Sequence, residues 1–268
     1  MNPVIEKFER AGSLVCVGLD SELGLLPERF QSQAEPQLAF NRWVIEETRE
    51  YIGAYKLNAA FYEARGAQGV LEMERTVAFL REAAPKAVTI CDAKRADIGN
   101  TNRGYVESIF DAMGFDAVTL HPYLGSEALK PFLERDDKLS IVLCRTSNPG
   151  AGELQDLLVE GQPLWKRVAH QVSTQWNARG NCALVVGATW PEEMREVRAT
   201  AATLPFLVPG IGAQGGDVRA VVDAGLDGRG GGLMISSSRG VIFAESPRAA
   251  AQALHQEIEE ARVTKSAR

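Results

Sequence analysis

The chain has 268 residues, of which 45% are hydrophobic and 24% are charged, and its formal net charge is −6. This composition is typical of a globular protein with a large core, and the negative charge gives no electrostatic reason to expect nucleic acid or an anionic membrane as a partner. No apolar run approaches the roughly 20 residues that a membrane-spanning helix needs. Residues 1–13 mix charged and apolar side chains and lack the apolar stretch of a signal peptide, so we expect an amphipathic first helix in a cytoplasmic protein.

Eight short apolar runs, rich in β-branched residues, are spaced along the chain. Most are continuously apolar, which is typical of parallel strands that are covered on both faces. The expected strands are residues 14–20, 54–58, 87–91, 117–120, 140–145, 182–188, 205–210 and 232–238.

Segments with charged faces alternate with these runs and are expected to be helices. Examples are residues 36–52, 66–84, 126–138 and 191–203. Ser126 is placed to cap the third of these helices, and Pro131 within the same segment predicts a short or broken helix. The Gly-rich segment 148–164 is expected to be a loop, and residues 260–268 a frayed helix end.

Strands that alternate with helices over a whole chain predict a parallel α/β fold. Eight such units without a linker favour a closed (β/α)8 TIM barrel over an open sheet. We therefore expect one TIM-barrel domain over residues 1–268, with its active site at the C-terminal ends of the strands.

The four cysteines lie within the expected strands: Cys16, Cys91, Cys144 and Cys182. No Cys-x-x-Cys spacing occurs and the chain has three histidines, so neither a zinc site nor a disulfide framework is expected. We expect buried, reduced thiols that pack as small hydrophobic groups.

Polar residues follow nearly every expected strand. Asp92 and Lys94 are two residues apart, so on an extended strand both point to the same face, into the mouth of the barrel. Asp20 ends the first expected strand and Lys56 lies on the second, and with Asp92 and Lys94 they can form an alternating array of carboxylates and ammonium groups. An ion-pair cluster that merely closes the barrel end is the alternative, but such a network is a poor stabilising device because desolvation offsets the attraction.

The loops after the seventh and eighth strands have the composition of an anion site. TIM barrels often bind phosphate with these two loops. The glycines in 210–216 let the backbone approach an anion, Gln214 can donate a hydrogen bond, and Arg239 can pair with phosphate oxygens. Because the glycine-rich segment and Arg239 lie on two consecutive loops of the barrel, we favour a site for a phosphorylated substrate. The alternative is a flexible loop next to an arginine at the surface.

These residues resemble the orotidine 5′-phosphate decarboxylase family, in its longer bacterial (type 2) subgroup. The D-x-K-x-x-D motif is shared with related sugar-phosphate barrels, whereas the complete set of motifs is specific and runs from the first strand to the eighth. The matching segments are "GLD" at 18–20, "YKLN" at 55–58, "DAKRAD" at 92–97 with "IGNT" after it, "RTSNPGAGELQ" at 145–155, "PGIGAQGGD" at 209–217 and "SSSRG" at 236–240.

The resemblance implies a cofactor-free and metal-free decarboxylation of orotidine 5′-monophosphate to UMP and CO2, the last step of de novo pyrimidine synthesis. Lys94 is implied to donate the proton and Asp92 to orient it, within an Asp-Lys-Asp charge array. The family is dimeric, and Asp97 and Thr101 are implied to reach the site of the neighbouring subunit. The remaining implied substrate contacts are Asp20 and Lys56 to the ribose, Ser147 to the pyrimidine, Gln214 and Arg239 to the phosphate, and Pro209 in the same site.

Two alternatives stay open on the residues alone. The aspartate–lysine motif also occurs in 3-keto-L-gulonate 6-phosphate decarboxylase and hexulose-6-phosphate synthase, which bind magnesium. The segments 147–155 and 210–217 argue against both. A catalytically silent barrel that binds a nucleotide is the second alternative, and ligand binding without turnover would reveal it.

Overall fold

The strands close into a barrel in the computed structural model, which describes residues 1–212 and 215–266. All neighbouring barrel strands are parallel, and their order is β1-β10-β9-β8-β5-β4-β3-β2. The expected fold class, an α/β TIM barrel, is therefore confirmed. The barrel strands are β1 (Val15–Gly18), β2 (Ala54–Asn58), β3 (Val88–Arg95), β4 (Ala117–Leu120), β5 (Leu139–Arg145), β8 (Cys182–Val186), β9 (Phe206–Pro209) and β10 (Leu233–Ser237).

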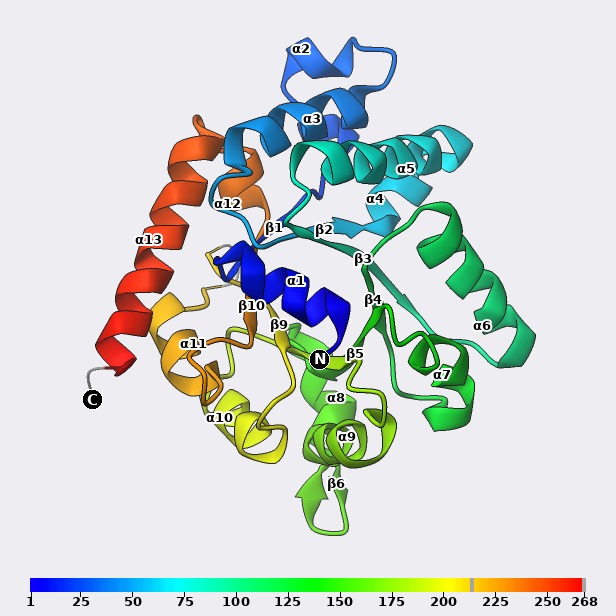
Figure 1. Ribbon diagram of the computed structural model, residues 1–268, viewed down its shortest axis with the longest axis vertical. Coiled ribbons are helices and arrows are strands. Elements are labelled where there is room, and N and C mark those ends of the chain that lie inside the picture. The colour runs from blue at the N-terminus through cyan, green and yellow to red at the C-terminus, as the bar shows by residue number, and fades with distance from the viewer. Residues whose placement is uncertain (213–214, 267–268) are drawn as a thin grey trace.

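Helices surround the barrel, and each strand feeds into a helix on the outside (Figure 1). The outer helices are α3 (Pro36–Thr48), α5 (Gly66–Ala83), α6 (Gly99–Val106), α7 (Gly125–Leu133), α9 (Leu164–Gln171), α10 (Pro191–Thr200), α11 (Val218–Gly225) and α13 (Pro247–Ser266). Shorter helices are α2 (Glu28–Gln31), α4 (Ala59–Glu63), α8 (Gly152–Gln155) and α12 (Arg239–Ile242), while π-helical turns at Glu107–Ala112 and Val172–Trp176 extend α6 and α9.

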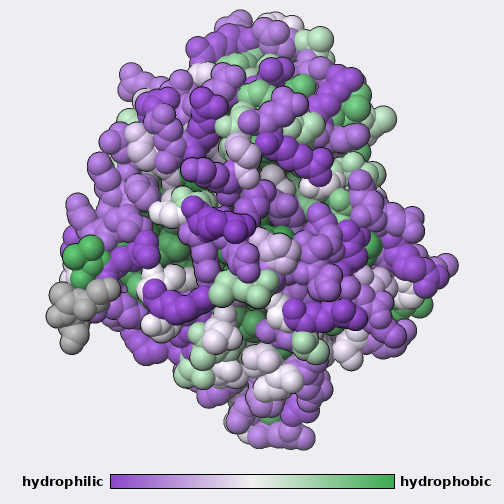
Figure 2. Space-filling view, in the orientation of Figure 1, coloured by the Kyte–Doolittle hydropathy of each residue, from purple (hydrophilic) through white to green (hydrophobic). Residues whose placement is uncertain are grey.

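The first helix, α1 (Pro3–Ala11), lies across the N-terminal end of the barrel (Figure 1). Asn2 caps it by accepting hydrogen bonds from the backbone N–H groups of Val4 and Ile5. Val4 and Phe8 are buried beneath it, so α1 closes the end of the barrel opposite to the polar strand ends. Figure 2 shows this face of the molecule as mainly hydrophilic, with scattered hydrophobic residues.

The core contains strand side chains from both faces of the sheet, and successive residues of β1, β4, β8 and β10 are all buried. Strand residues such as Val17, Ile90 and Ile235 are fully buried, as parallel strands covered by helices require. The four cysteines are free and buried, as expected, and burial raises the pKa of each thiol to about 12. Within the described part of the chain, no helix has both the length and the apolar character needed to cross a membrane.

Three local expectations are wrong. Helix α7 begins at Gly125 without a side-chain cap, so Ser126 lies inside its first turn instead of capping it. The helix includes Pro131 but ends at Leu133, so the expectation of a short helix in segment 126–138 is confirmed. Segment 148–164 is not only loop: it contains α8 and a two-stranded hairpin, β6 (Leu158–Val159) and β7 (Gln162–Pro163). Its two-residue turn has positive φ angles, 54° at Glu160 and 80° at Gly161, which suit the twist of a tight hairpin. Helix α13 is helical to Ser266, so the fraying expected from residue 260 is not seen up to that residue, and residues 267–268 lie outside the described residues.

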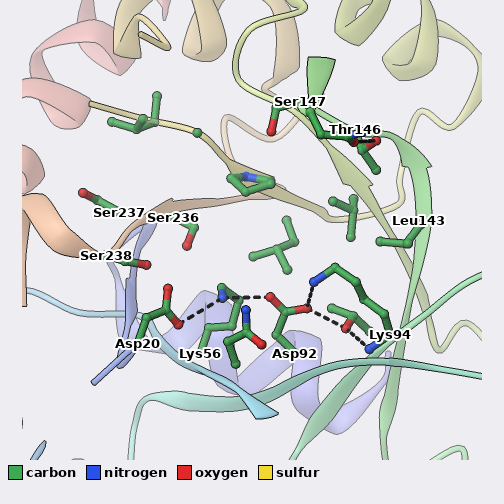
Figure 3. Close-up of a pocket in the computed structure, with 18 of the residues that line it drawn as sticks. Asp20, Lys56, Asp92, Lys94, Leu143, Thr146, Ser147, Ser236, Ser237 and Ser238 are labelled. Carbon is green, nitrogen blue, oxygen red and sulfur yellow. Dashed lines mark hydrogen bonds and ion pairs between the residues drawn. The ribbon is translucent and has the colours of Figure 1, made fainter. Parts of the chain in front are cut away.

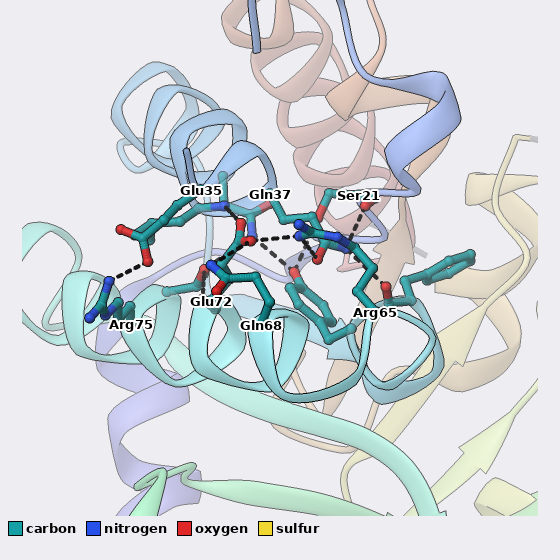
Figure 4. A network of polar contacts seen from close by, with 12 residues as sticks. Ser21, Glu35, Gln37, Arg65, Gln68, Glu72 and Arg75 are labelled. Atoms are coloured by element: carbon teal, nitrogen blue, oxygen red, sulfur yellow. Dashed lines mark hydrogen bonds and ion pairs between the residues drawn. The ribbon is translucent and has the colours of Figure 1, made fainter. Parts of the chain in front are cut away.

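The buried carboxylate of Glu72 on α5 connects this helix with α3, near the segment that follows β1 (Figure 4). Glu72 is fully buried and accepts hydrogen bonds from the backbone N–H of Leu38 at 2.9 Å and from Arg65 at 2.6 Å. Arg65 also donates to Gln37, whose amide holds the carbonyl of Ser21 at 2.8 Å. The network therefore anchors the chain just after β1.

Replacing Glu72 with alanine is expected to lower the free energy of unfolding by about 3–5 kcal/mol, because it leaves buried donors and a partly buried cation without their partner. The matched control is Arg75→Ala, which removes the ion pair with Glu35 at a side chain that is half exposed, and should cost at most about 1 kcal/mol. Urea denaturation of the wild type and both variants measures the difference. Equal losses in the two variants would contradict the structural importance of Glu72.

Candidate active site

A cavity of about 530 Å³ opens at the C-terminal ends of the barrel strands. Its walls combine the charged strand ends with two polar loops and an apolar floor. The lining residues that carry the argument are Asp20, Lys56, Asn58, Asp92, Lys94, Thr119, Thr146, Ser147, Gln155, Pro209, Ser236, Ser237, Ser238 and Arg239.

The four charged side chains singled out in the sequence form one continuous line along the cavity (Figure 3). The ammonium of Lys56 lies 2.9 Å from Oδ2 of Asp92 and 3.7 Å from Oδ1 of Asp20. The ammonium of Lys94 lies 2.7 Å from the other oxygen of Asp92, Oδ1. Carboxylate and ammonium groups therefore alternate in the order Asp20, Lys56, Asp92, Lys94, as the strand positions predicted.

The charged forms of the inner pair stabilise each other. Burial alone would raise the pKa of Asp92, but the ammonium groups of Lys56 and Lys94 outweigh it and hold that pKa well below its usual range. Burial alone would lower the pKa of Lys56, yet Asp92 and Asp20 keep it above its usual value. Lys56 and Asp92 are therefore both charged at neutral pH. Lys94 differs from them because half of its side chain is exposed to the cavity, where a substrate would lie.

Lys94 does not have the extended backbone from which its direction was predicted. Its φ is 46°, in the left-handed region that residues other than glycine seldom adopt. The pairing of β3 with β4 is shifted between Cys91 and Arg95, so Lys94 lies in a bulge. Asp92 and Lys94 still meet at the cavity, but through this bulge and not through simple alternation.

The opposite part of the cavity suits an anion. Gly210 and Gly212 have φ angles of 107° and 75°, which permit the tight path of the chain after β9. Arg239 follows β10 and lines the cavity together with the hydroxyl-bearing segment 236–238. Gln214, predicted in the same loop, lies outside the described residues.

The remaining predicted residues divide into two groups. Ser147 and Pro209 line the cavity, Ser147 across it from the charged line (Figure 3). Asp97 and Thr101 do not line the cavity of this chain. They belong to the segment after β3, where Asp97 accepts a hydrogen bond from the N–H of Ile98 and Thr101 is exposed.

Two lining residues were missed in the sequence. Thr119, on β4, donates a hydrogen bond to Oδ1 of Asp92 at 2.8 Å. The sequence feature that could have indicated Thr119 is its place as the one polar residue in the apolar strand 117–120, which follows the strand with Asp92 and Lys94. Gln155 holds the loop after β5, because its amide donates to Thr146 Oγ1 at 2.8 Å and accepts from the N–H of Thr146 at 3.0 Å. Only its place in the long Gly-rich segment could have indicated it.

The arrangement of possible ligand side chains determines whether a metal ion can bind. Among residues 1–212 and 215–266, no group of three or more His, Cys, Asp or Glu side chains is arranged to hold a metal ion. The carboxylates of Asp20 and Asp92 instead pair with the ammonium groups of Lys56 and Lys94.

A parallel eight-stranded barrel with a charged cavity at the carboxyl ends of its strands defines a TIM-barrel enzyme. Residues 13–254 match the model of the orotidine 5′-phosphate decarboxylase / HUMPS family. The chain therefore belongs to this family. Its similarity to named decarboxylases places it among the carboxy-lyases.

The relatives match over almost their whole length. The orotidine 5′-phosphate decarboxylase of Cellvibrio japonicus is 44% identical, with 96% of this chain and 98% of the relative covered. The enzyme of that name from Halorubrum lacusprofundi is 48% identical over 89% of this chain and 86% of its own. The solved structure of Leishmania donovani OMP decarboxylase superimposes with a TM-score of 0.88 at 40% identity and covers 97% of this chain and 98% of that one.

The charge state of Asp92 predicts how its contribution to stability depends on pH. Because the folded-state pKa is depressed, the contribution is complete above the unfolded pKa of about 3.9 and is lost as pH falls through the folded-state value. We expect Asp92→Asn to be less stable than the wild type by a constant amount from about pH 5 to 8, and by a shrinking amount below about pH 4.

Urea denaturation of both proteins over a pH series measures this difference. A difference that already shrinks between about pH 7 and 5 would contradict a depressed pKa, because Asp92 would then gain its proton near or above the normal range for an aspartate.

Proposed function

We propose that this protein decarboxylates orotidine 5′-monophosphate to UMP and CO2. The observation that carries the proposal is the alternating line of Asp20, Lys56, Asp92 and Lys94 beside a cavity with an anion-suited end, in a chain that is 44% identical to a named orotidine 5′-phosphate decarboxylase. The line supplies a proton donor, and the opposite loops supply a place for the phosphate. The reaction belongs to pyrimidine synthesis and is proposed to take place in the cytoplasm.

Lys94 is the proposed proton donor. When the bond between C6 of the pyrimidine and the carboxyl carbon breaks, CO2 leaves without charge and the electron pair stays on C6. The ammonium of Lys94 stabilises this developing negative charge and then transfers a proton to C6. The resulting neutral amine regains its proton from water. The partial exposure of Lys94 toward the cavity supports this role, because its partners in the line are buried and already paired.

Asp92 and Lys56 preorganise the donor. The carboxylate of Asp92 holds Lys94 at 2.7 Å and is itself fixed by Lys56 at 2.9 Å, so the cation is in place before the substrate arrives. Electrostatic catalysis depends on such groups being oriented in advance. The carboxylate of Asp92 would also repel the substrate carboxylate, which would disfavour the ground state. Asp20 and Lys56 are proposed to bind the ribose hydroxyls.

Arg239 and Gln214 are proposed to bind the 5′-phosphate, and Ser147 the pyrimidine. The phosphate lies far from the reacting carbon, so its binding free energy can drive closure of the loops around the cavity. The lining by Arg239 and the positive φ angles of Gly210 and Gly212 support a phosphate at this end.

Replacing Lys94 with alanine is expected to lower kcat for orotidine 5′-monophosphate by about 10³-fold, since it removes both the proton donor and the cation. The assay follows the ultraviolet absorbance of the substrate with a chelator present. Lys130→Ala is the matched control, because Lys130 is 65% exposed on α7 and should leave kcat unchanged. Undiminished turnover by Lys94→Ala would contradict the role. Turnover only of a sugar phosphate with magnesium would favour the related activities of the family.

We further propose a homodimer in which Asp97 and Thr101 complete the site of the partner subunit. Their absence from the cavity of their own chain supports this arrangement. So does the apolar surface around them: Ile98 is 58% exposed, and Tyr123 and Leu124, after the neighbouring strand β4, are 84% and 46% exposed. Exposed apolar side chains at the ends of two neighbouring strands support a surface at which a second subunit binds.

Mixing two inactive variants tests the shared site. In a mixed dimer of Lys94→Ala with Asp97→Ala, one site receives both substitutions and the other receives neither. Random reassociation of an equimolar mixture makes half of the dimers mixed, each with one intact site of two, and should therefore restore about one quarter of the wild-type activity. Each variant alone should stay inactive at the same concentration. No recovery from a mixture whose subunits demonstrably exchange would show that Asp97 acts only in its own chain.

A further inference from the structure

Thr119 contacts two residues of the charged line, Asp92 and Lys94. It lies on β4 and is 1% exposed. Its hydroxyl donates to Oδ1 of Asp92 at 2.8 Å and accepts the backbone N–H of Lys94 at 3.0 Å. Oδ1 is also the oxygen that binds the ammonium of Lys94. One hydroxyl group therefore contacts the carboxylate and the backbone of the lysine that the carboxylate holds.

The position of Thr119 coincides with the interruption of the sheet. Cys91 pairs with Val118 and Arg95 pairs with Leu120, so the stretch 92–94 on β3 faces the single residue Thr119 on β4. A bulge leaves backbone groups without their regular partners in the neighbouring strand. The hydroxyl of Thr119 takes over that function for the N–H of Lys94.

The backbone of Lys94 needs this support. Its φ of 46° is unfavourable for a residue with a Cβ and persists only where the surrounding contacts fix it. This conformation sets the direction in which the lysine side chain leaves the strand. An aliphatic side chain at position 119 would fill the same space but could neither accept from Lys94 nor donate to Asp92.

We propose that Thr119 is a positioning residue that fixes the backbone of Lys94 and the orientation of the Asp92 carboxylate, and so aims the ammonium group at the reacting carbon. The inference rests on the proposed function of Lys94 as proton donor. Thr119 acts through its two neighbours, so its hydroxyl should matter for the chemical step and not for binding of the substrate.

The test compares Thr119→Val, which removes the hydroxyl, with Thr119→Ser, which keeps it. Misplacement of a reacting group by about 1 Å can cost about 100-fold in rate, so we expect Thr119→Val to lose about 10- to 100-fold in kcat. Its KM should stay within about threefold of wild type, because ground-state contacts are retained. Thr119→Ser should recover most of kcat.

Thr89 provides a matched control at the far end of β3. It is 2% exposed, and its hydroxyl likewise donates to a carboxylate, Asp116 Oδ2 at 3.1 Å, and accepts a backbone N–H, that of Asp116 at 3.0 Å. Thr89→Val should lose stability without losing kcat. If Thr119 had only a structural role, Thr119→Val would behave like Thr89→Val. Both variants would then lose stability, and kcat per folded molecule would be unchanged in both.

Crystal structures of the two Thr119 variants separate this inference from the proposed function. Lys94 should leave the left-handed region in Thr119→Val and keep it in Thr119→Ser. An active wild type with unchanged kcat in Thr119→Val would overturn the inference alone. An inactive wild type would overturn the proposed function. In that case the crystal structure of Thr119→Val still tests the inference, because an unchanged φ of Lys94 would show that Thr119 does not fix the backbone of Lys94 and would overturn the inference as well.

Discussion

The carboxylate of Asp92 is the group on which the rest of the site depends, because it is held between two ammonium groups. Each of its oxygens accepts from a different lysine, Lys56 at 2.9 Å and Lys94 at 2.7 Å. Two unit charges about 4 Å apart attract by about 4 kcal/mol at an effective dielectric constant of 20, and desolvation takes back much of this. The arrangement therefore contributes less to stability than its short distances suggest. Its value lies in fixing a cation beside an open cavity.

The fold places these charges by bringing consecutive strands side by side. The register pairs Asn58 with Asp92, so Lys56 and Asp92 reach the cavity from neighbouring strands. A buried polar network supports the segment that carries Asp20, since the hydroxyl of Tyr62 donates to the carbonyl of Leu19 at 2.8 Å. Arg65 donates both to Glu72 and to Gln37, and the amide of Gln37 donates to the carbonyl of Ser21 (Figure 4). The charged side chains are thus carried by barrel strands and by a segment that buried hydrogen bonds hold in place, as a preorganised site requires.

The sequence predicts the barrel and the charged line because both follow from where the apolar runs lie and which residues stand at their ends. Apolar runs that alternate with segments with charged faces give the strands, and Asp92 and Lys94 fall where one of these runs ends. It does not predict the bulge at Lys94 or the hydroxyl of Thr119, since both depend on the pairing register of β3 with β4, which no local pattern encodes. The sequence does not predict the hairpin at 158–163 either, because its strands are two residues long and too short to show an alternating pattern.

The central claim, that Asp92 and Lys94 act as one unit, is tested most directly by a double-mutant cycle on kcat for orotidine 5′-monophosphate. The proteins are the wild type, Asp92→Asn, Lys94→Ala and the double variant. Groups that act as a unit have strongly non-additive effects, so the double variant should be about as slow as the slower single variant. A double variant whose loss in kcat equals the product of the two single losses would contradict the claim.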